Sequence, residues 1–216
     1  MRVASDTRDR LISATGRLLR RQGYAATGLN QVVAEADAPK GSMYFHFPGG
    51  KEELAAAAVD RFAGRITANM TDLLARNSVG DAISGFFDSY IAHFERTNFC
   101  DGCVVATVAL DEASTHELLA EAASRALVTW VDLVADALEG EGRTPQEAHQ
   151  LSTLVIAALE GTIVMAKGQH SVEPFEAARD ALRTILARDR RDGYVESTFG
   201  ADPNATVPAR DEWERG

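Results

Sequence analysis

The chain has 216 residues, of which 45% are hydrophobic and 25% are charged, and its formal net charge is −10. This composition is typical of a soluble globular protein with one or two domains. The N-terminal segment is charged throughout, unlike a secretory signal, and the most apolar run, residues 153–166, is shorter than the ~18 apolar residues of a membrane span. We therefore expect a cytoplasmic protein with no membrane partner.

Charge is distributed unevenly along the chain. Residues 1–51 contain eight basic and four acidic side chains, whereas the rest of the chain contains fourteen basic and twenty-eight acidic ones. A basic segment on an acidic body is typical of a protein that faces a polyanion. A solvated basic helix face would give the same asymmetry, so charge alone leaves both interpretations open.

Apolar residues recur with the period of an α-helix along most of the chain, and no segment alternates as a β-strand does. Gly23 is expected to end the first helix in a left-handed conformation, and Thr144 is expected to open the eighth helix with a capping box. The sequence therefore predicts an all-α fold, with helices at 6–22, 28–36, 39–46, 51–76, 80–98, 103–113, 116–139, 145–168 and 173–187.

The helices at 28–36 and 39–46 are joined by a two-residue turn, which is the arrangement of a helix-turn-helix. Met43 and Phe47 lie one helical turn apart and would anchor the second of these helices on the first helix of the chain. The residues left pointing outward are Lys40, Gly41, Ser42, Tyr44 and Phe45. Such side chains, on a helix narrow enough for the major groove, are those that phosphate and base recognition uses.

The segment Pro48-Gly49-Gly50 breaks the chain after this short helix, and Lys51 follows at the start of the next one. Its ammonium group and the unpaired amides of the helix N-terminus are placed to hold one phosphate together. The sequence thus predicts a phosphate contact beside the outward face of the short helix.

Cys100 and Cys103 form a CxxC pair. A redox couple would need the βαβ pattern of a thioredoxin-like fold, and zinc would need two further ligands at motif spacing. A turn before a helix is the simpler interpretation, although redox sensing stays open as an alternative. Enzyme motifs are absent from the sequence, so we predict no catalytic residues, no cofactor and no metal site.

The helix at 145–168 is apolar on two faces, whereas a helix of a monomer needs only one buried face. One face carries Leu151, Leu154, Val155, Ala158, Thr162 and Met165, and the other carries Ile156, Leu159, Ile163 and Val164. A central core helix would explain this pattern, and so would a dimer interface. The partly apolar helix at 173–187 favours a homodimer formed through both helices.

Residues 27–54, TGLNQVVAEADAPKGSMYFHFPGGKEEL, resemble the N-terminal DNA-binding motif of TetR-type transcriptional regulators. Residues 102–114, GCVVATVALDEAS, resemble the LmrA/YxaF-like subgroup of that family. Asp37 stands where the family has its turn glycine, and Pro39 where it has a helix-capping serine. Aspartate tolerates the left-handed conformation, so we expect the turn to survive. The residues that carry the resemblance are Gly41, Tyr44, His46, Phe47, Lys51 and Leu54.

The resemblance implies a three-helix, helix-turn-helix DNA-binding domain at 1–50 and a helical ligand-binding and dimerisation domain at 51–187. Residues 188–216 are charged and poor in apolar side chains, which predicts a mobile tail. The resemblance also implies contacts with DNA. Phosphate would be held by Thr27, Tyr44 and Lys51, and base edges would be read by Lys40, Ser42 and Phe45. Gly41 would allow close approach to the DNA backbone, and His46 would pack at the end of the helix.

The function implied is that of a repressor that binds a palindromic, double-stranded DNA operator as a homodimer and is released by a small-molecule effector. The effector pocket would be lined by Phe87, Tyr90, Phe94, Trp130, Thr162 and Met165, although plain packing explains each of them singly. Polar tips among apolar groups suit an aromatic or amphipathic effector, and Glu160 would favour a cationic one. The alternative function is a helical small-molecule or redox-sensing module, with Cys100 and Cys103, that acts through protein partners.

Overall fold

The structure is a computed structural model that describes residues 2–111 and 115–187, and the predicted tail at 188–216 lies outside these residues. Within the described ranges all regular structure is helical, which confirms the all-α prediction. The helices are α1 (Arg2–Ala26), α2 (Leu29–Glu35), α3 (Lys40–His46), α4 (Gly50–Leu74), α5 (Val79–Arg96), α6 (Val104–Asp111), α7 (Glu117–Gly140), α8 (Pro145–Gln169) and α9 (Glu173–Ala187). Most predicted boundaries differ from these by one to three residues, although α1 begins four residues earlier than expected.

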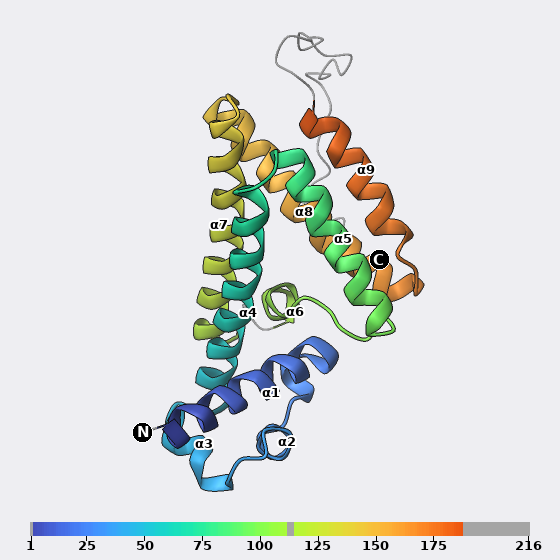
Figure 1. The fold of residues 1–216 in the computed structure, drawn as a ribbon. Helices are drawn as coiled ribbons and strands as arrows, with labels where there is room; N and C mark the ends of the chain where they lie inside the picture. Colours follow the sequence, from blue (N-terminus) through green and yellow to red (C-terminus); the bar gives the residue numbers. More distant parts are fainter. Residues whose placement is uncertain (1, 112–114, 188–216) are drawn as a thin grey trace, which may run out of the picture.

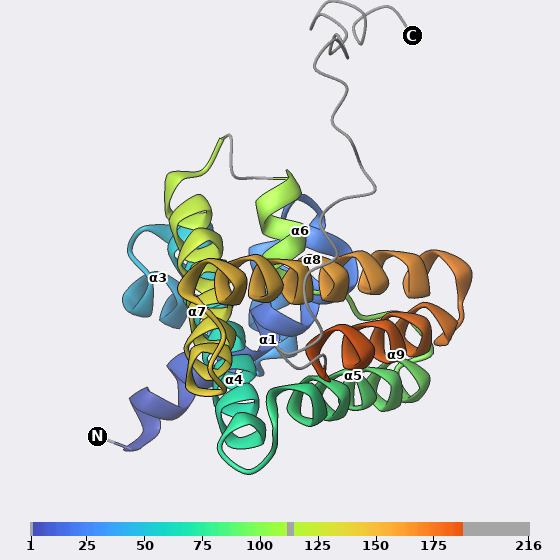
Figure 2. The same cartoon turned by 90° about the horizontal axis from the view of Figure 1, so that it is seen from above.

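Helices α1, α2 and α3 form a small head, and α4 leads from it into a larger helical body (Figure 1). In the body, α4 packs along α7, and α5 packs along α9. Seen from above, α8 crosses the body next to α7 and α9 and has one side that no other helix covers (Figure 2). The short α6 lies between the head and the body and contacts both α1 and α7. The head therefore meets the body through α4 and α6.

The core of the head forms as the sequence predicted. Leu11 and Leu19 of α1 are buried against Val32 of α2, and both Met43 and Phe47 are buried beneath α3. This packing anchors a seven-residue helix that would be marginal on its own in water. The outward orientation of α3 thus follows from the burial of its two apolar anchors.

Three special backbone positions shape the head. Gly23 has φ of 76° and breaks α1 where the sequence predicted its end, although three more residues continue in helical conformation. Asp37 has φ of 47°, which confirms that aspartate takes the left-handed position of the turn. The guanidinium of Arg10 donates to the carbonyls of Ala36 (3.0 Å) and Asp37 (2.7 Å), so α1 holds the turn directly. Pro39 lies one position before α3, not at its first helical residue.

Helix α8 begins with the predicted capping box, in which Thr144 and Glu147 satisfy each other's backbone amides. Its buried face differs from both predicted stripes, because it combines members of each: Ala148, Ser152, Val155, Ile156, Leu159, Thr162, Ile163 and Ala166. The opposite face exposes apolar side chains, those of Leu154, Val164 and Met165. Among the described residues α8 is also the one helix long and apolar enough to span a membrane by length and composition, although part of it is buried inside the protein. An apolar second face accounts for that composition.

Candidate DNA-binding surface and effector cavity

The outer face of α3 exposes two large aromatic side chains. Tyr44 is 62% exposed and Phe45 is 78% exposed, whereas Met43 between them and the α1 helix is 1% exposed. Lys40 and Gly41 are exposed beside them, and a side chain added at Gly41 would meet nothing within 4 Å. Exposed aromatic rings are unfavourable in water, and these two rings do not contribute to the core. This face is therefore a candidate contact surface.

Ser42 and His46 are half-buried on the same helix. The Ser42 hydroxyl donates to the carbonyl of Pro39 at 2.6 Å, and thereby closes the first turn of α3 where a capping side chain is missing. The His46 ring packs edge-on against Phe45, with ring centres 5.0 Å apart. Ser42 therefore stabilises the start of α3, and His46 packs against the exposed Phe45 ring at its end.

Thr27 lies behind this surface, and the prediction for its side chain needs correction. It is 2% exposed, and its hydroxyl donates to the carbonyl of Gly23 at 2.6 Å. The N-cap of α2 is the neighbouring Gly28. Because the chain bends sharply at Gly23, the Thr27 side chain is turned inward to hold the corner between α1 and α2.

Lys51 lies in the first turn of α4, as predicted. Its Nζ is 4.0 Å from the centre of the Tyr24 ring, a cation–π contact that orients the side chain. Two amides at the helix start are already bonded, that of Gly49 to the Glu53 carboxylate (2.8 Å) and that of Gly50 to the carbonyl of Phe47 (2.9 Å). These two amides are therefore already used within the protein, and a phosphate contact of the Lys51 ammonium group with the remaining amides of the helix start stays a prediction.

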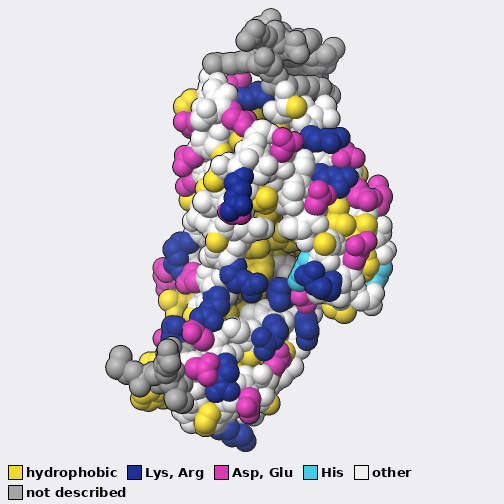
Figure 3. Space-filling model, viewed as in Figure 1, with side chains coloured by type: hydrophobic (Ala, Val, Ile, Leu, Met, Phe, Trp, Pro, Cys, Tyr) yellow, Lys and Arg dark blue, Asp and Glu magenta, His cyan; other side chains and the backbone are white. Residues whose placement is uncertain are grey.

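A half-open cavity of about 380 Å³ lies between the head and the body. In Figure 3 it is the hollow in the middle of the molecule, where dark-blue basic side chains surround a patch of apolar ones. Helix α1 contributes one lining residue and the body contributes the others. The lining consists of Arg20, Phe62, Arg65, Ile66, Asn69, Ser89, Tyr90, His93, Phe94, Arg96 and Gly102.

Two of the six predicted effector residues, Tyr90 and Phe94, line this cavity. Phe87 and Trp130 are core residues: Phe87 packs edge-on against Phe175, and the Trp130 indole donates to the Thr67 hydroxyl at 3.1 Å. The remaining two, Thr162 and Met165, are on α8 away from the cavity. Thr162 is buried and donates to the carbonyl of Leu159, whereas Met165 is 49% exposed on the outer face. Helical periodicity did not distinguish cavity from core or from outer surface.

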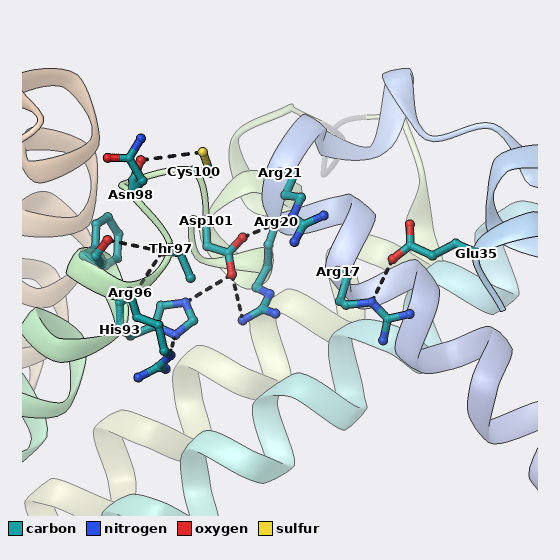
Figure 4. A network of polar contacts seen from close by, with 11 residues as sticks. Arg17, Arg20, Arg21, Glu35, His93, Arg96, Thr97, Asn98, Cys100 and Asp101 are labelled. Atoms are coloured by element: carbon teal, nitrogen blue, oxygen red, sulfur yellow. Dashed lines mark hydrogen bonds and ion pairs between the residues drawn. The ribbon is translucent and has the colours of Figure 1, made fainter.

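One buried carboxylate joins the body to the head beside the cavity. Asp101, in the segment between α5 and α6, lies 3.4 Å from Nη1 of Arg20 and 3.6 Å from Nε of Arg21 (Figure 4). Its side chain is only 5% exposed, and the next residue, Gly102, donates its amide to the carbonyl of Arg20 at 3.1 Å. Both arginines belong to α1, so this cluster ties the head to the end of α5.

His93 completes the cluster as a neutral ring. Burial, followed by the nearby Arg20 charge, lowers the pKa of His93, and Asp101 only partly opposes this shift. Arg96 can only donate, so the Nδ1 atom of His93, 3.1 Å away, accepts its hydrogen bond. The Nε2 atom therefore carries the proton and donates it to Asp101 at 3.1 Å. The ring thus fixes Asp101 in position without adding charge.

A second acidic group, Glu160 of α8, is buried in the body near Tyr90 and Cys103. Both side-chain oxygens of Glu160 are buried, and the Cys103 thiol lies beside them as a weak hydrogen-bond donor. Burial raises the pKa of Glu160 to about 7, and the neighbouring Cys103 thiol lowers it only in part. Burial and the Glu160 charge together raise the pKa of Cys103 well above its usual range. Glu160 is consequently about half protonated near pH 7, while Cys103 stays a neutral thiol.

The two cysteines lie in different surroundings. Cys100 is exposed and its thiol faces the carbonyl of Asn98, whereas Cys103 is buried, and both are free thiols. The described residues include no cluster of three or more groups that could hold a metal ion. The raised pKa of Cys103 disfavours the thiolate, which is the reactive form of a cysteine.

Sequence reasoning missed the basic lining of the cavity. Arg20, Arg65 and Arg96 come from three different helices, so no local pattern in the sequence groups them. A weak signal was available, because His93 and Arg96 are spaced three residues apart and so share one helix face. Their convergence with α1 depends on how the head packs on the body.

The fold and its surface define a helix-turn-helix DNA-binding protein with a helical regulatory body. The chain is similar to known regulators of this class. Residues 11–58 match bacterial regulatory proteins of the tetR family, and residues 80–181 match the C-terminal domain of LmrA/YxaF-like transcriptional regulators. Over 184 residues it is 33% identical to the HTH-type transcriptional regulator LmrA of Bacillus subtilis. The aligned region covers 85% of this chain and 98% of LmrA.

Solved structures of regulators from the same family have a similar fold. A TetR transcriptional regulator from Chloroflexus aurantiacus is 28% identical and superposes with a TM-score of 0.75, covering 88% of this chain and 98% of that one. The reduced form of Escherichia coli NemR is 25% identical with a TM-score of 0.71, covering 83% and 97%. The chain therefore belongs to the TetR family of transcriptional regulators, and its C-terminal domain is of the LmrA/YxaF-like kind. It is a DNA-binding transcriptional regulator.

Proposed function

We propose that the protein is a repressor that binds a palindromic operator as a homodimer and leaves it when a small molecule occupies the body. The observation that carries the proposal is the outer face of α3, where Tyr44 and Phe45 are exposed while Met43 and Phe47 anchor the helix. Among the relatives, the E. coli protein NemR is named a transcriptional repressor. A basic head on an acidic body fits a DNA-facing surface.

Each residue of the surface has a proposed role. Lys51 and Tyr44 contact phosphate, while Lys40, Ser42 and Phe45 lie on the side that enters the major groove. The exposed Phe45 ring suits the methyl group of thymine, and the open space at Gly41 allows close approach. His46 orients Phe45 through ring packing.

Thr27 is proposed to act on DNA indirectly. Its buried hydroxyl holds the corner between α1 and α2, and this corner positions the whole helix-turn-helix.

A second copy of the chain is the proposed occupant of the outer face of α8. Leu154, Val164 and Met165 are exposed there, and the positions between them are small residues, Ala157 and Gly161. Small residues let two helices approach closely, and apolar ones gain from burial. With α9 alongside, this face would form the dimer, and a palindromic operator then requires the two α3 helices to lie ~34–36 Å apart, one DNA turn.

Effector binding is proposed to act through α4 and α1. Arg61 of α4 donates to the Asp9 carbonyl (3.0 Å) and to the Ser13 hydroxyl (3.2 Å) of α1, so a shift of α4 moves the head. A coupling of ~1–3 kcal/mol between effector and operator is typical of such proteins. The effector must bind the DNA-free state more tightly, because otherwise it shifts no equilibrium.

Selection of DNA from a random pool by the full-length protein tests this function. We expect enrichment of one palindromic sequence, bound by two protomers in a gel shift. Enrichment of no sequence, or of a single half-site bound by one protomer, would overturn the proposal.

The alternative, a redox-sensing module that acts through protein partners, is less well supported. Burial keeps Cys103 in its thiol form, and the described residues show no disulfide between the two cysteines. The redox alternative would be favoured if mild oxidation abolished operator binding by the wild type but left operator binding by Cys100→Ser intact.

A further inference from the structure

We propose that the cavity between head and body binds an amphipathic anion, a small carboxylate with an aromatic or aliphatic body, and that Arg20 is shared between this anion and Asp101. The inference rests on the proposed function, because it names the chemical class of the effector and its route to the DNA-binding head. It concerns residues of three helices, α1, α4 and α5, that surround one space.

The charge of the lining supports an anion. Arg20, Arg65 and Arg96 line the cavity, and the lining contains no carboxylate. Among the described residues Arg65 has no ion-pair partner, and Arg96 contacts the neutral His93 ring. The positive charges of Arg65 and Arg96 are therefore not balanced by a carboxylate among the described residues. On a body with a large excess of acidic residues, this is a local site of the opposite sign.

The other part of the lining is apolar. Phe62, Ile66, Phe94 and the ring of Tyr90 line the same space, and the Arg20 guanidinium lies over the Phe62 ring at 6.0 Å. A volume of about 380 Å³ falls within the ~300–1,000 Å³ of small-molecule sites. A ligand with a flat or aliphatic body would fill the apolar part while its carboxylate meets the arginines.

Glu160 does not oppose this chemistry. It is absent from the lining of the cavity, and burial raises the pKa of its carboxyl group to about 7, so that about half of this group is uncharged at pH 7. The expectation of a cationic effector, which was based on Glu160, is therefore replaced by the opposite one.

Arg20 connects the cavity to the DNA-binding head. It lies on α1, lines the cavity, and pairs with Asp101 at 3.4 Å. A carboxylate in the cavity competes with Asp101 for this guanidinium, while Arg21 holds Asp101 from outside the cavity at 3.6 Å. Anion binding thus weakens one of the two side-chain links between α1 and the α5–α6 segment. By reciprocity, loss of the Asp101 charge must strengthen anion binding.

Calorimetry with two matched probes tests the chemical class. We expect 2-naphthoate to bind the full-length wild type at least roughly tenfold more tightly than 2-naphthamide, since a charge-assisted hydrogen bond is lost in the amide. Arg65→Gln should remove most of this difference. Arg76→Gln, which changes a surface arginine paired with Asp72, should leave it unchanged. Equal binding of the two probes, or binding of neither, overturns the proposal.

The sharing of Arg20 has its own test, with Arg21 as the matched control. Arg20→Gln should weaken 2-naphthoate binding roughly tenfold, whereas Arg21→Gln, outside this cavity, should not weaken it. Asp101→Asn should strengthen 2-naphthoate binding severalfold, provided that circular dichroism shows a folded protein. A purely structural Asp101 would leave the affinity unchanged or lower it, and that result would overturn the sharing.

Operator release is measured separately, on the DNA selected by the wild type. We expect 2-naphthoate to weaken operator binding by wild type and not by Arg65→Gln. If no DNA sequence is selected, the proposed function fails while calorimetry still decides the anion site. If DNA is bound but the carboxylate has no advantage over the amide, only this inference fails.

Discussion

Asp101 Oδ2 lies 3.4 Å from Arg20 Nη1, and this contact joins the end of the cavity-lining helix α5 to the first helix of the DNA-binding head (Figure 4). The carboxylate is 5% exposed and His93 donates to it from α5. A charge that is buried, hydrogen-bonded and shared by two arginines of another unit holds a defined geometry between the two.

Asp101→Asn should lower the free energy of unfolding by about 1–3 kcal/mol, because the substitution leaves buried donors without a charged acceptor. Urea denaturation at fixed protein concentration measures it. The Arg21→Gln/Asp101→Asn double-mutant cycle should show a coupling of about 0.5 kcal/mol or more, as expected for residues in contact. Strict additivity would show that the Arg21 link contributes nothing.

Lys51→Ala should weaken binding to all DNA sequences and reduce the salt dependence of affinity by about one phosphate per protomer. The measurement is a series of operator affinities at increasing salt. Lys51→Arg keeps the charge and the contact with the Tyr24 ring, so it should preserve the salt slope. An unchanged slope in Lys51→Ala would remove this residue from the interface.

Phe45→Ala should reduce the discrimination between right and wrong bases at particular base pairs, by roughly 1–3 kcal/mol for each pair. It should hardly change the free energy of unfolding, because the ring is 78% exposed. Ser42→Ala is expected to act in the same way at other positions. Met43→Ala is the contrasting variant: its side chain is 1% exposed, and truncation should cost about 2–5 kcal/mol. Uniform weakening by Phe45→Ala on all sequences would show that it does not read bases.

Glu160 should make stability depend on pH. Its pKa is raised from 4.5 to about 7 in the folded protein, so the protonated form is favoured there. The contribution of Glu160 to the free energy of unfolding is therefore fully present below pH 4.5. It falls as the pH rises toward 7, by up to about 3 kcal/mol. Glu160→Gln should flatten this dependence, as measured by denaturation from pH 5 to 8. Glu139→Gln, at an exposed position, should leave it intact.

Val164→Asp should dissociate the proposed dimer, because it puts a charge at the centre of the apolar face of α8, where Val164 is 61% exposed. Sedimentation velocity gives the oligomeric state. Val128→Asp on α7 is the control, since that side chain is 55% exposed outside the proposed interface. A dimer that persists in Val164→Asp would place the interface elsewhere.

Local patterns in the sequence were enough to predict the helices and the exposed face of α3. The break at Gly23 and the capping box at Thr144 each depend on neighbours within a few residues, and the four-residue spacing of Met43 and Phe47 is enough to predict which side of α3 is buried. Such features are encoded by spacing and by residue type. The motif at 27–54 accordingly indicated both the fold of the head and its function.

Tertiary packing decided the rest. Thr27 turned inward because the chain bends at Gly23, and Phe87, Trp130 and Thr162 became core residues while Met165 stayed outside. An amphipathic stripe shows which face of a helix is apolar, but not whether that face meets core, cavity or a second chain. The basic cavity and the Asp101 cluster unite α1, α4 and α5, which lie far apart in sequence. Their chemistry exists only where the head docks on the body.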